Sequence, residues 1–195
     1  MISIAVIGRA SHGPHDPVPE AALSAAHEVG KLIARAGAAL VCGGATGVME
    51  ASCRGAREEG GLTIGILAGT ERNSANPYVD VALPTGLGTA RNLIYPRACD
   101  ATIMIGGGAG TLNELTIAYQ GGRSVVVVEG TGGWADRIKA SLFEGRFLDE
   151  RRVAEISLVS TPKEAVEVAV SIARRLEAEP RTRDDPARWI GADRF

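Results

Sequence analysis

Short, largely apolar runs alternate with segments of helical periodicity along most of this chain. Strands that are buried on both faces have this appearance, because neighbouring side chains on both sides of the sheet then lie in a core. The predicted strands are residues 2–7, 39–42, 62–67, 79–83, 101–105, 124–128 and 156–160. Alternation of strands with helices predicts an open, mostly parallel sheet with right-handed crossovers. We therefore expect an α/β fold of three layers, with helices on both faces of a central sheet.

The composition and length agree with this architecture. Aromatic residues make up only 4% of the 195 residues, so the core has to consist of Val, Ile, Leu and Ala. A chain of this length supplies one well-buried core and is short for two. We expect a single domain over residues 1–179. The composition then turns polar, which predicts a tail over residues 180–195.

Periodicity and end signals place helices between the strands. The predicted helices are residues 20–36, 89–98, 111–120 and 135–143, with one more after residue 46 and a last one after residue 161. Thr46 is the expected N-cap of the second helix. Thr161, Pro162 and Glu164 supply the cap, the first-turn proline and the capping box of the last helix. Pro96 is out of place inside a helix over residues 89–98.

Charge and cysteine usage narrow the class of function. The net charge of -2 predicts no general affinity for nucleic acid or for an anionic membrane. The chain opens on a strand with no basic segment before it, and no apolar run approaches the roughly 18 residues of a membrane span. Cys42, Cys53 and Cys99 lack CxxC spacing, which is typical of reduced, buried thiols. We expect a cytoplasmic protein that binds neither nucleic acid nor membrane.

A glycine-rich turn over residues 106–111 (GGGAGT) follows a predicted buried strand and opens a helix. Backbone N–H groups at such a helix start converge on an anion, and the helix dipole favours negative charge there. Gly107, Gly108 and Gly110 would expose those groups, and the Thr111 hydroxyl would add a donor. A tight strand–helix turn explains a single glycine, but four glycines favour a phosphate site.

Two other phosphate motifs are absent. A Walker A loop ends in Gly-Lys-Ser/Thr, and this turn has no lysine. A dinucleotide fingerprint follows the first strand, but residues 8–13 (GRASHG) do not fit GxGxxG. Residues 42–44 (CGG) stand where an acid would contact a ribose. Hydride chemistry on NAD is therefore disfavoured.

A second glycine element, residues 43–49 (GGATGVM), repeats the strand–glycine–helix arrangement. Ligands of parallel sheets bind at the carboxyl ends of the strands, so two such turns would hold one ligand from two sides. Packing of the helix on its strand is the alternative explanation for Gly47. Arg9 and Ser11 follow the first strand and are expected to face the same cleft.

Arg91 and Glu114 are the charged candidates, because both are expected to rim the same strand ends. A carboxylate there could orient a ribose or act as general acid or base, and an arginine could hold a phosphate. The alternative is an ordinary surface ion pair.

Other polar residues are weaker candidates. His12 and His15 lack a third or fourth metal ligand, so no metal site is expected. His27 has the spacing of a packed helix face. Cys42 precedes the glycines of the second element, but no partner base is evident for a nucleophile.

Several motifs resemble those of the LOG family, the cytokinin-activating phosphoribohydrolases often mislabelled lysine decarboxylases. They are Arg91-Asn92, Asp100 and residues 106–114 (GGGAGTLNE). That family carries an Arg-Lys pair and then Pro-Gly-Gly-x-Gly-Thr-x-x-Glu, with the same arginine-to-glutamate separation. Residues 43–49 resemble its other glycine motif, and the resemblance covers roughly residues 2–128.

The departures point to a sister branch. Gly106 replaces the proline of the LOG motif, Asn92 the lysine, and Asn113 the first of two acidic residues. Residues 61–67 and 85–92, with the triple glycine, are closer to a branch similar to the molybdenum-cofactor carrier proteins, which bind a pterin phosphate without known turnover. The resemblance implies a Rossmann-like fold, a homo-oligomer and a phosphorylated heterocyclic ligand, either molybdenum cofactor or a nucleotide.

Two functions stay open. The first is carrier-type binding of a phosphorylated pterin or nucleotide-like ligand. The second is LOG-type hydrolysis of a nucleoside 5′-monophosphate to free base and ribose 5-phosphate, for which the resemblance implies Arg91 and Glu114 as the catalytic pair. Neither requires a cofactor for chemistry. The expected ligand contacts are Gly43, Gly44, Gly47, Met49, Asn92, Gly107, Gly108, Gly110 and Thr111. DNA binding, as in the DNA-processing protein A family of the same general fold, is disfavoured by the net negative charge.

Overall fold

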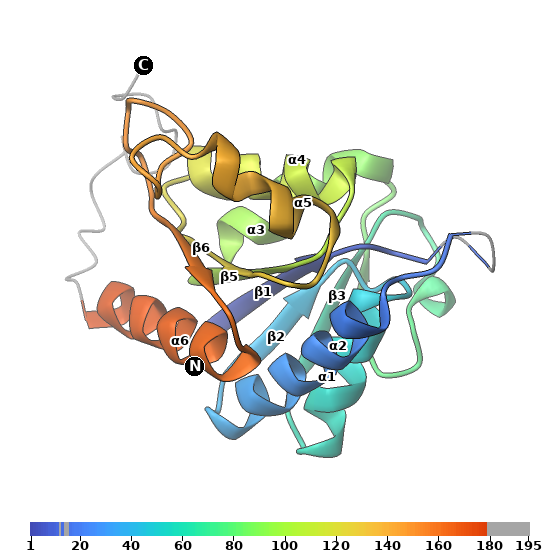
Figure 1. Cartoon of the computed structure of the whole chain (residues 1–195). Helices are drawn as coiled ribbons and strands as arrows, with labels where there is room; N and C mark the ends of the chain where they lie inside the picture. The colour runs from blue at the N-terminus through green and yellow to red at the C-terminus, as the bar shows by residue number, and fades with distance from the viewer. Residues whose placement is uncertain (12, 14–15, 179–195) are drawn as a thin grey trace, which may run out of the picture.

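A computed structural model describes the chain except residues 12, 14–15 and 179–195. Seven strands form one sheet in the order β4-β3-β2-β1-β5-β6-β7, and every neighbouring pair is parallel (Figure 1). The strands are β1 (Ser3–Gly8), β2 (Ala39–Cys42), β3 (Thr63–Leu67), β4 (Val81–Pro84), β5 (Ala101–Ile105), β6 (Val125–Val128) and β7 (Ile156–Val159). The predicted α/β sandwich is confirmed, and its sheet is wholly parallel.

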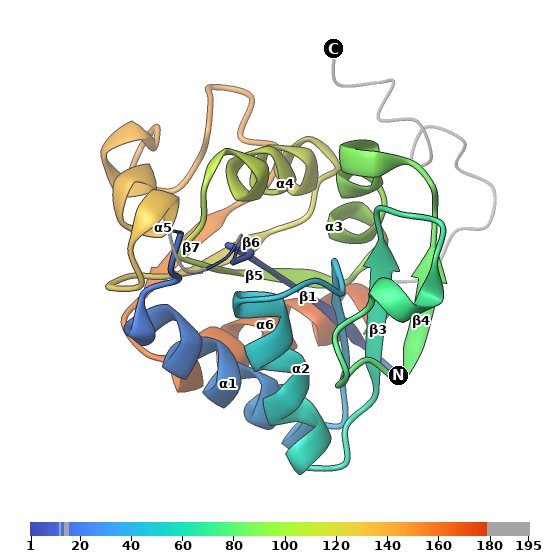
Figure 2. The same cartoon turned by 90° about the vertical axis from the view of Figure 1, so that its right-hand side faces the viewer.

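Helices cover both faces of the sheet. The α-helices are α1 (Glu20–Arg35), α2 (Val48–Glu58), α3 (Tyr95–Ala98), α4 (Ala109–Gln120), α5 (Gly133–Arg137) and α6 (Pro162–Ala178), and the 3-10 helices are η1 (Arg72–Ser74), η2 (Gly88–Leu93) and η3 (Ile138–Ser141). Helices α1, α2 and α6 pack on one face, and α3, α4 and α5 pack on the other (Figure 2). None of these helices is long and apolar enough to cross a membrane.

The central strand β1 shows why the predicted strands are apolar throughout. Ile4 and Val6 belong to the core under α1, α2 and α6, whereas Ala5 and Ile7 belong to the core under α3, α4 and α5. All four side chains are fully buried. Because successive side chains point to opposite faces, a strand with helices on both sides has no polar face.

Helices α1 and α2 approach each other closely through two glycines. A Cβ on Gly30 of α1 would lie 2.0 Å from the carbonyl oxygen of Ser52. A Cβ on Gly55 of α2 would lie 2.0 Å from the carbonyl oxygen of His27. The two backbones therefore meet at positions where no other residue fits.

The structure corrects two predicted helices. Residues 89–98 form η2 followed by α3, since Pro96 occupies the first turn of a new helix rather than the interior of one. Residues 135–143 form α5 and η3, which ends at Ser141. The capping box of α6 is confirmed, because Glu164 N donates to Thr161 Oγ1 at 3.2 Å and Glu164 Oε2 accepts from Thr161 N at 3.2 Å. The predicted tail lies outside the described residues.

Thr46 does not cap α2 as predicted. Gly47 is the N-cap residue, and no side chain caps the helix. The Thr46 hydroxyl instead donates to the carbonyl oxygen of Ser11 at 2.9 Å and accepts from Ser11 N at 3.2 Å. The Thr46 hydroxyl, which the local sequence predicted to cap α2, therefore makes a tertiary contact instead.

Candidate functional site

A cleft of about 430 Å³ lies at the carboxyl ends of the central strands. The chain runs outward from β1 to β4 and then returns to β5 on the other side of β1. The loops after β1 and β5 diverge at this reversal, where ligands of open parallel sheets bind. Gly8 and Arg9 line the cleft from β1, and residues 108–111 line it from the start of α4.

A buried ion pair forms one wall of the cleft. Arg91 Nη1 donates to Glu114 Oε1 at 3.2 Å, and the two side chains are only 13% and 6% exposed. The pair is therefore no surface ion pair, and both residues line the cleft. Since burying charge is costly, a pair retained here at the sheet edge is typical of a binding or catalytic site.

Tyr95 contacts both members of the ion pair and forms a buried cluster with them. Its hydroxyl donates to Glu114 Oε1 at 2.5 Å, and the Arg91 guanidinium lies 5.3 Å from the centre of its ring. Oε1 of Glu114 thus accepts two hydrogen bonds, while no described residue donates to Oε2. The second oxygen is the one left for a ligand in the cleft.

Burial is the largest influence on the pKa values of Glu114 and Tyr95. It raises the pKa of Glu114 above the ordinary value, although the Tyr95 hydroxyl and the Arg91 guanidinium both favour the carboxylate. Burial and the neighbouring carboxylate together raise the pKa of Tyr95. Tyr95 therefore stays a hydrogen-bond donor at physiological pH, and Glu114 is more easily protonated than an exposed glutamate.

The glycine turn after β5 divides into two parts. Gly106 and Gly107 have φ values of 60° and 107° and are held by packing, since a Cβ on Gly107 would lie 2.5 Å from Thr111 Cβ. Gly106 N donates to Thr131 Oγ1 at 2.8 Å. Gly108 and Gly110, with Thr111, line the cleft at the first turn of α4. The first N–H groups of a helix have no intrahelical acceptor and are free for an anion.

The glycines of the element after β2 lie behind the cleft rather than in it. A Cβ on Gly43 would lie 2.3 Å from Arg91 Nη1, so Gly43 makes room for the guanidinium. Gly44 packs against Leu67, because a Cβ on Gly44 would lie only 2.4 Å from Leu67 Cδ2. Gly47 also has a packing role, but its contact is with the backbone of Arg9 after β1 and not with the strand that precedes its own helix. Met49 is the residue of this element that lines the cleft.

Residues 1–166 match the family model described as SLOG cluster4 family. The chain belongs to the SLOG cluster4 family. It is 39% identical to TM1055, whose X-ray structure superposes with a TM-score of 0.81 over 88% of this chain and 99% of that one. An uncharacterised protein of Archaeoglobus fulgidus is 43% identical over 111 residues, which are 54% of this chain and 73% of that protein.

This SLOG protein is also similar to two proteins associated with molybdenum cofactor. The molybdenum cofactor binding protein of Rippkaea orientalis is 31% identical over 88% of this chain and 96% of that one, with a TM-score of 0.74. The molybdenum cofactor carrier protein of Chlamydomonas reinhardtii is 30% identical over 89% and 98%, with a TM-score of 0.72. DNA processing protein A of Helicobacter pylori, at 15% identity and a TM-score of 0.59, shares the fold alone.

The remaining predicted contacts divide between this cleft and other places. Asn92 lines the cleft, and its Nδ2 donates to Asn113 Oδ1 at 3.1 Å. Arg9 lines it and forms an ion pair with Asp16. Ser11 does not line it, because the segment after β1 turns this side chain away.

The weaker candidates have structural explanations in the SLOG protein. Asp100 accepts from Ser3 N at 2.8 Å, at the end of the sheet opposite the cleft. His27 pairs with Glu58 at 2.9 Å.

Cys42 and Cys53 are buried with their sulfurs 3.5 Å apart. A hydrogen bond from Cys53 lowers the pKa of Cys42. His12 and His15 lie outside the described residues, and elsewhere no cluster of His, Cys, Asp and Glu could hold a metal.

Sequence reasoning missed Tyr95 and Asp16. Tyr95 follows Arg91 by four residues and precedes a proline, a context that carries no chemical pattern. Asp16 lies in a polar loop, and only its ion pair with Arg9 in the structure connects it with the cleft. No motif in the sequence would have identified either residue.

Proposed function

We propose that this chain binds a phosphorylated pterin or nucleotide-like ligand in the cleft and carries it without turning it over. The observation that carries the proposal is the buried Arg91–Glu114 pair beside the first turn of α4. The free N–H groups of that turn and the guanidinium suit a phosphate. Oε2 of Glu114 suits a hydroxyl or ring N–H of the same ligand.

Molybdenum cofactor is the cargo that the similar proteins suggest. In this proposal a pterin phosphate would place its phosphate at residues 108–111 and the N–H groups of the pterin toward Glu114, all of which line the same cleft. A nucleoside monophosphate offers the same combination of phosphate and donors. The ligand is cargo in this proposal, and the protein needs no cofactor of its own.

Mass spectrometry of the small molecules released from native protein on denaturation tests the proposal. We expect a phosphorylated pterin or nucleotide from the wild type and less of it from Glu114→Gln and Thr111→Val. Glu129→Gln is the matched control, because Glu129 pairs with Lys139 at the surface. If no such molecule is released, or if all variants release equal amounts, the carrier proposal is wrong.

A phosphoribohydrolase is the second candidate, favoured by the raised pKa of buried Glu114. A buried carboxyl group whose pKa is raised above its ordinary value can act as general acid on a leaving base. Hydrolysis adds water across the N-glycosidic bond and yields the free base and ribose 5-phosphate. Incubation with AMP and with isopentenyl-AMP, followed by detection of free base, distinguishes the candidates. Base release that Glu114→Gln abolishes would establish the enzyme and refute the pure carrier.

We also propose that the chain forms a homo-oligomer through the edge of the sheet at β4. Val81 and Leu83 of β4 are 40% and 45% exposed, and Leu87 and Leu93 beside or within η2 are 52% and 54% exposed. Such a patch on an unpaired edge strand is typical of an interface. Light scattering should give a mass above one chain, and Leu83→Lys with Leu93→Lys should reduce it. A single-chain mass for the wild type would contradict the proposal.

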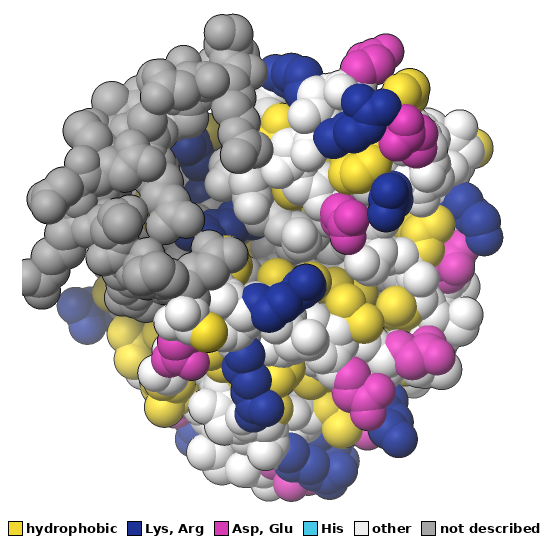
Figure 3. Space-filling model, turned by 90° about the vertical axis from the view of Figure 1, so that its left-hand side faces the viewer, with side chains coloured by type: hydrophobic (Ala, Val, Ile, Leu, Met, Phe, Trp, Pro, Cys, Tyr) yellow, Lys and Arg dark blue, Asp and Glu magenta, His cyan; other side chains and the backbone are white. Residues whose placement is uncertain are grey.

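Figure 3 shows one face of the molecule, on which basic and acidic side chains of the described residues are interspersed. We propose that the protein does not bind nucleic acid, because its net charge is -2 and because the described part of this face lacks the continuous basic groove that single-strand binding requires. Salt-sensitive binding of single-stranded DNA would contradict this.

A further inference from the structure

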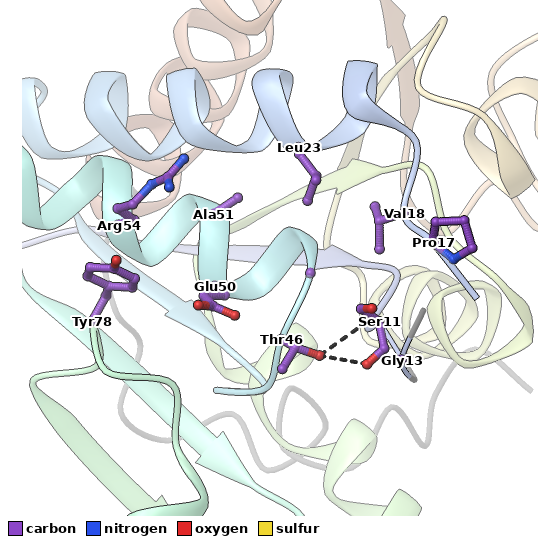
Figure 4. A pocket seen from close by; sticks show the side chains of 11 residues that line it. Ser11, Gly13, Pro17, Val18, Leu23, Thr46, Glu50, Ala51, Arg54 and Tyr78 are labelled. Atoms are coloured by element: carbon purple, nitrogen blue, oxygen red, sulfur yellow. Dashed lines mark hydrogen bonds between the residues drawn. The ribbon is translucent and has the colours of Figure 1, made fainter. Parts of the chain in front are cut away.

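A second pocket, of about 670 Å³, lies between the first turns of α1 and α2 (Figure 4). Its apolar side consists of Val18 and Leu23, which come from α1 and the segment before it. Ser11 and Thr46 close one end through their mutual hydrogen bonds, and Tyr78 lies toward the other end (Figure 4). The pocket thus has apolar, aromatic and polar parts, as small-molecule sites do.

A thin wall separates this pocket from the cleft. Val48 N donates to the carbonyl oxygen of Arg9 at 3.0 Å. A Cβ on Gly47 would lie 2.4 Å from that same oxygen. The two backbone segments are therefore in direct contact, with Arg9 and Met49 lining the cleft and Ser11 and Glu50 lining the pocket. A ligand in the pocket would occupy a site distinct from the cleft.

Three polar groups of the pocket have no partner within the described part of the chain. The Glu50 carboxylate, the Arg54 guanidinium and the Tyr78 hydroxyl form no hydrogen bond or ion pair with any described residue. Glu50 and Arg54 lie one turn apart on α2, a spacing at which opposite charges commonly pair. They do not pair here, and Arg54 extends toward α1 while Glu50 does not (Figure 4). Ala51, which lies between them in the sequence, also lines the pocket.

The charges restrict what can bind. A carboxylate only accepts hydrogen bonds, and a guanidinium only donates them. An inorganic anion would be repelled by Glu50, and a simple cation by Arg54. A flat ring with two N–H groups on one edge and acceptors on another would satisfy both residues, with its faces against Tyr78 and the apolar side.

We propose that this pocket is a second binding site for a guanine-type base, a fused ring with the 2-amino-4-oxo pattern. Its ring N–H and amino group would both donate to Glu50, and its carbonyl oxygen and ring nitrogen would accept from Arg54. Adenine lacks the paired donors, because its amino group lies beside a ring nitrogen that accepts. The pocket should therefore discriminate between the two bases.

Calorimetric titration of the full chain with guanosine and adenosine tests the proposal, since neither nucleoside carries a phosphate for the cleft. Guanosine should bind at least about tenfold more tightly than adenosine, given the strength of hydrogen bonds to charged groups. Glu50→Gln and Arg54→Met should each weaken guanosine binding about tenfold or more. Both side chains are partly or fully exposed, so the variants should fold.

Two further variants separate this site from others. Glu59→Gln, at the C-cap position of α2 and outside the pocket, should bind guanosine like the wild type. Thr111→Val, in the cleft, should do the same, so failure of the carrier proposal leaves this test intact. The proposal is overturned if guanosine does not bind, if adenosine binds equally well, or if Glu50→Gln has no effect. Loss of guanosine binding in Thr111→Val would place the base in the cleft and would also overturn it.

Discussion

Replacing Tyr95 with phenylalanine removes one oxygen atom from the buried cluster and leaves the ring in place. The hydroxyl donates to Glu114 Oε1 at 2.5 Å, and Tyr95 is 1% exposed. A hydrogen bond to a charged group contributes about 1.5–3 kcal/mol to stability. The full contribution is lost when the group that remains is buried and no water can replace the missing donor. In a chain of this size about 1 kcal/mol corresponds to about 2–4 °C, so Tyr95→Phe should lower Tm by about 3–12 °C.

Tyr119→Phe is the matched control for thermal unfolding followed by circular dichroism. Tyr119 is also 1% exposed, but its hydroxyl donates at 3.2 Å to Asp149, whose side chain is partly in solvent. Water can replace that hydroxyl, so the loss should be less than half as large. The reasoning is refuted if Tyr95→Phe unfolds at the wild-type temperature, or if both variants lose the same amount.

The same substitution should shift the pH dependence of stability. Because burial raises the pKa of Glu114, the folded chain binds this proton more tightly than the unfolded chain. Stability is therefore lost as pH rises from the ordinary glutamate pKa through the raised folded-state pKa. Tyr95→Phe removes a contact that favours the carboxylate, raises the pKa of Glu114 further and moves this window upward. Profiles of Tm against pH that coincide for the two proteins would contradict the assignment.

Three other substitutions test separate parts of the structure. Glu114→Gln should remove this component of the pH profile, and a Tm difference from wild type that is constant with pH would count against it. Gly43→Ala should cost about 1 kcal/mol of stability, because only the end of the Arg91 side chain has to move. It should nevertheless weaken binding of AMP, and unchanged affinity in a calorimetric titration would contradict the placement of Arg91. Gly30→Ala should cost about 3 kcal/mol or more in chemical denaturation, since its Cβ meets the Ser52 backbone, and a near-neutral result would refute the close approach of α1 and α2.

The sequence by itself determined the architecture and the location of the cleft. Apolar runs such as residues 101–105 can be satisfied only where both faces of a strand are covered, so their alternation with helices leads to a parallel sheet. The glycines after β5 require a turn into a helix, and that helix start lies at the carboxyl edge of the sheet. These conclusions rest on local chemistry and on general rules of chain connection.

Only the tertiary structure decided which side chains face the cleft. Gly43 and Gly107 belong to glycine motifs, yet one makes room for Arg91 and the other fits the turn, because a missing side chain can serve packing as well as a ligand. Ser11 lies only two residues after Arg9 but lines a different pocket. Tyr95 meets Glu114 across 19 positions of sequence. Such contacts depend on side-chain directions and on distant segments that pack together, which the spacing of residues along the chain does not encode.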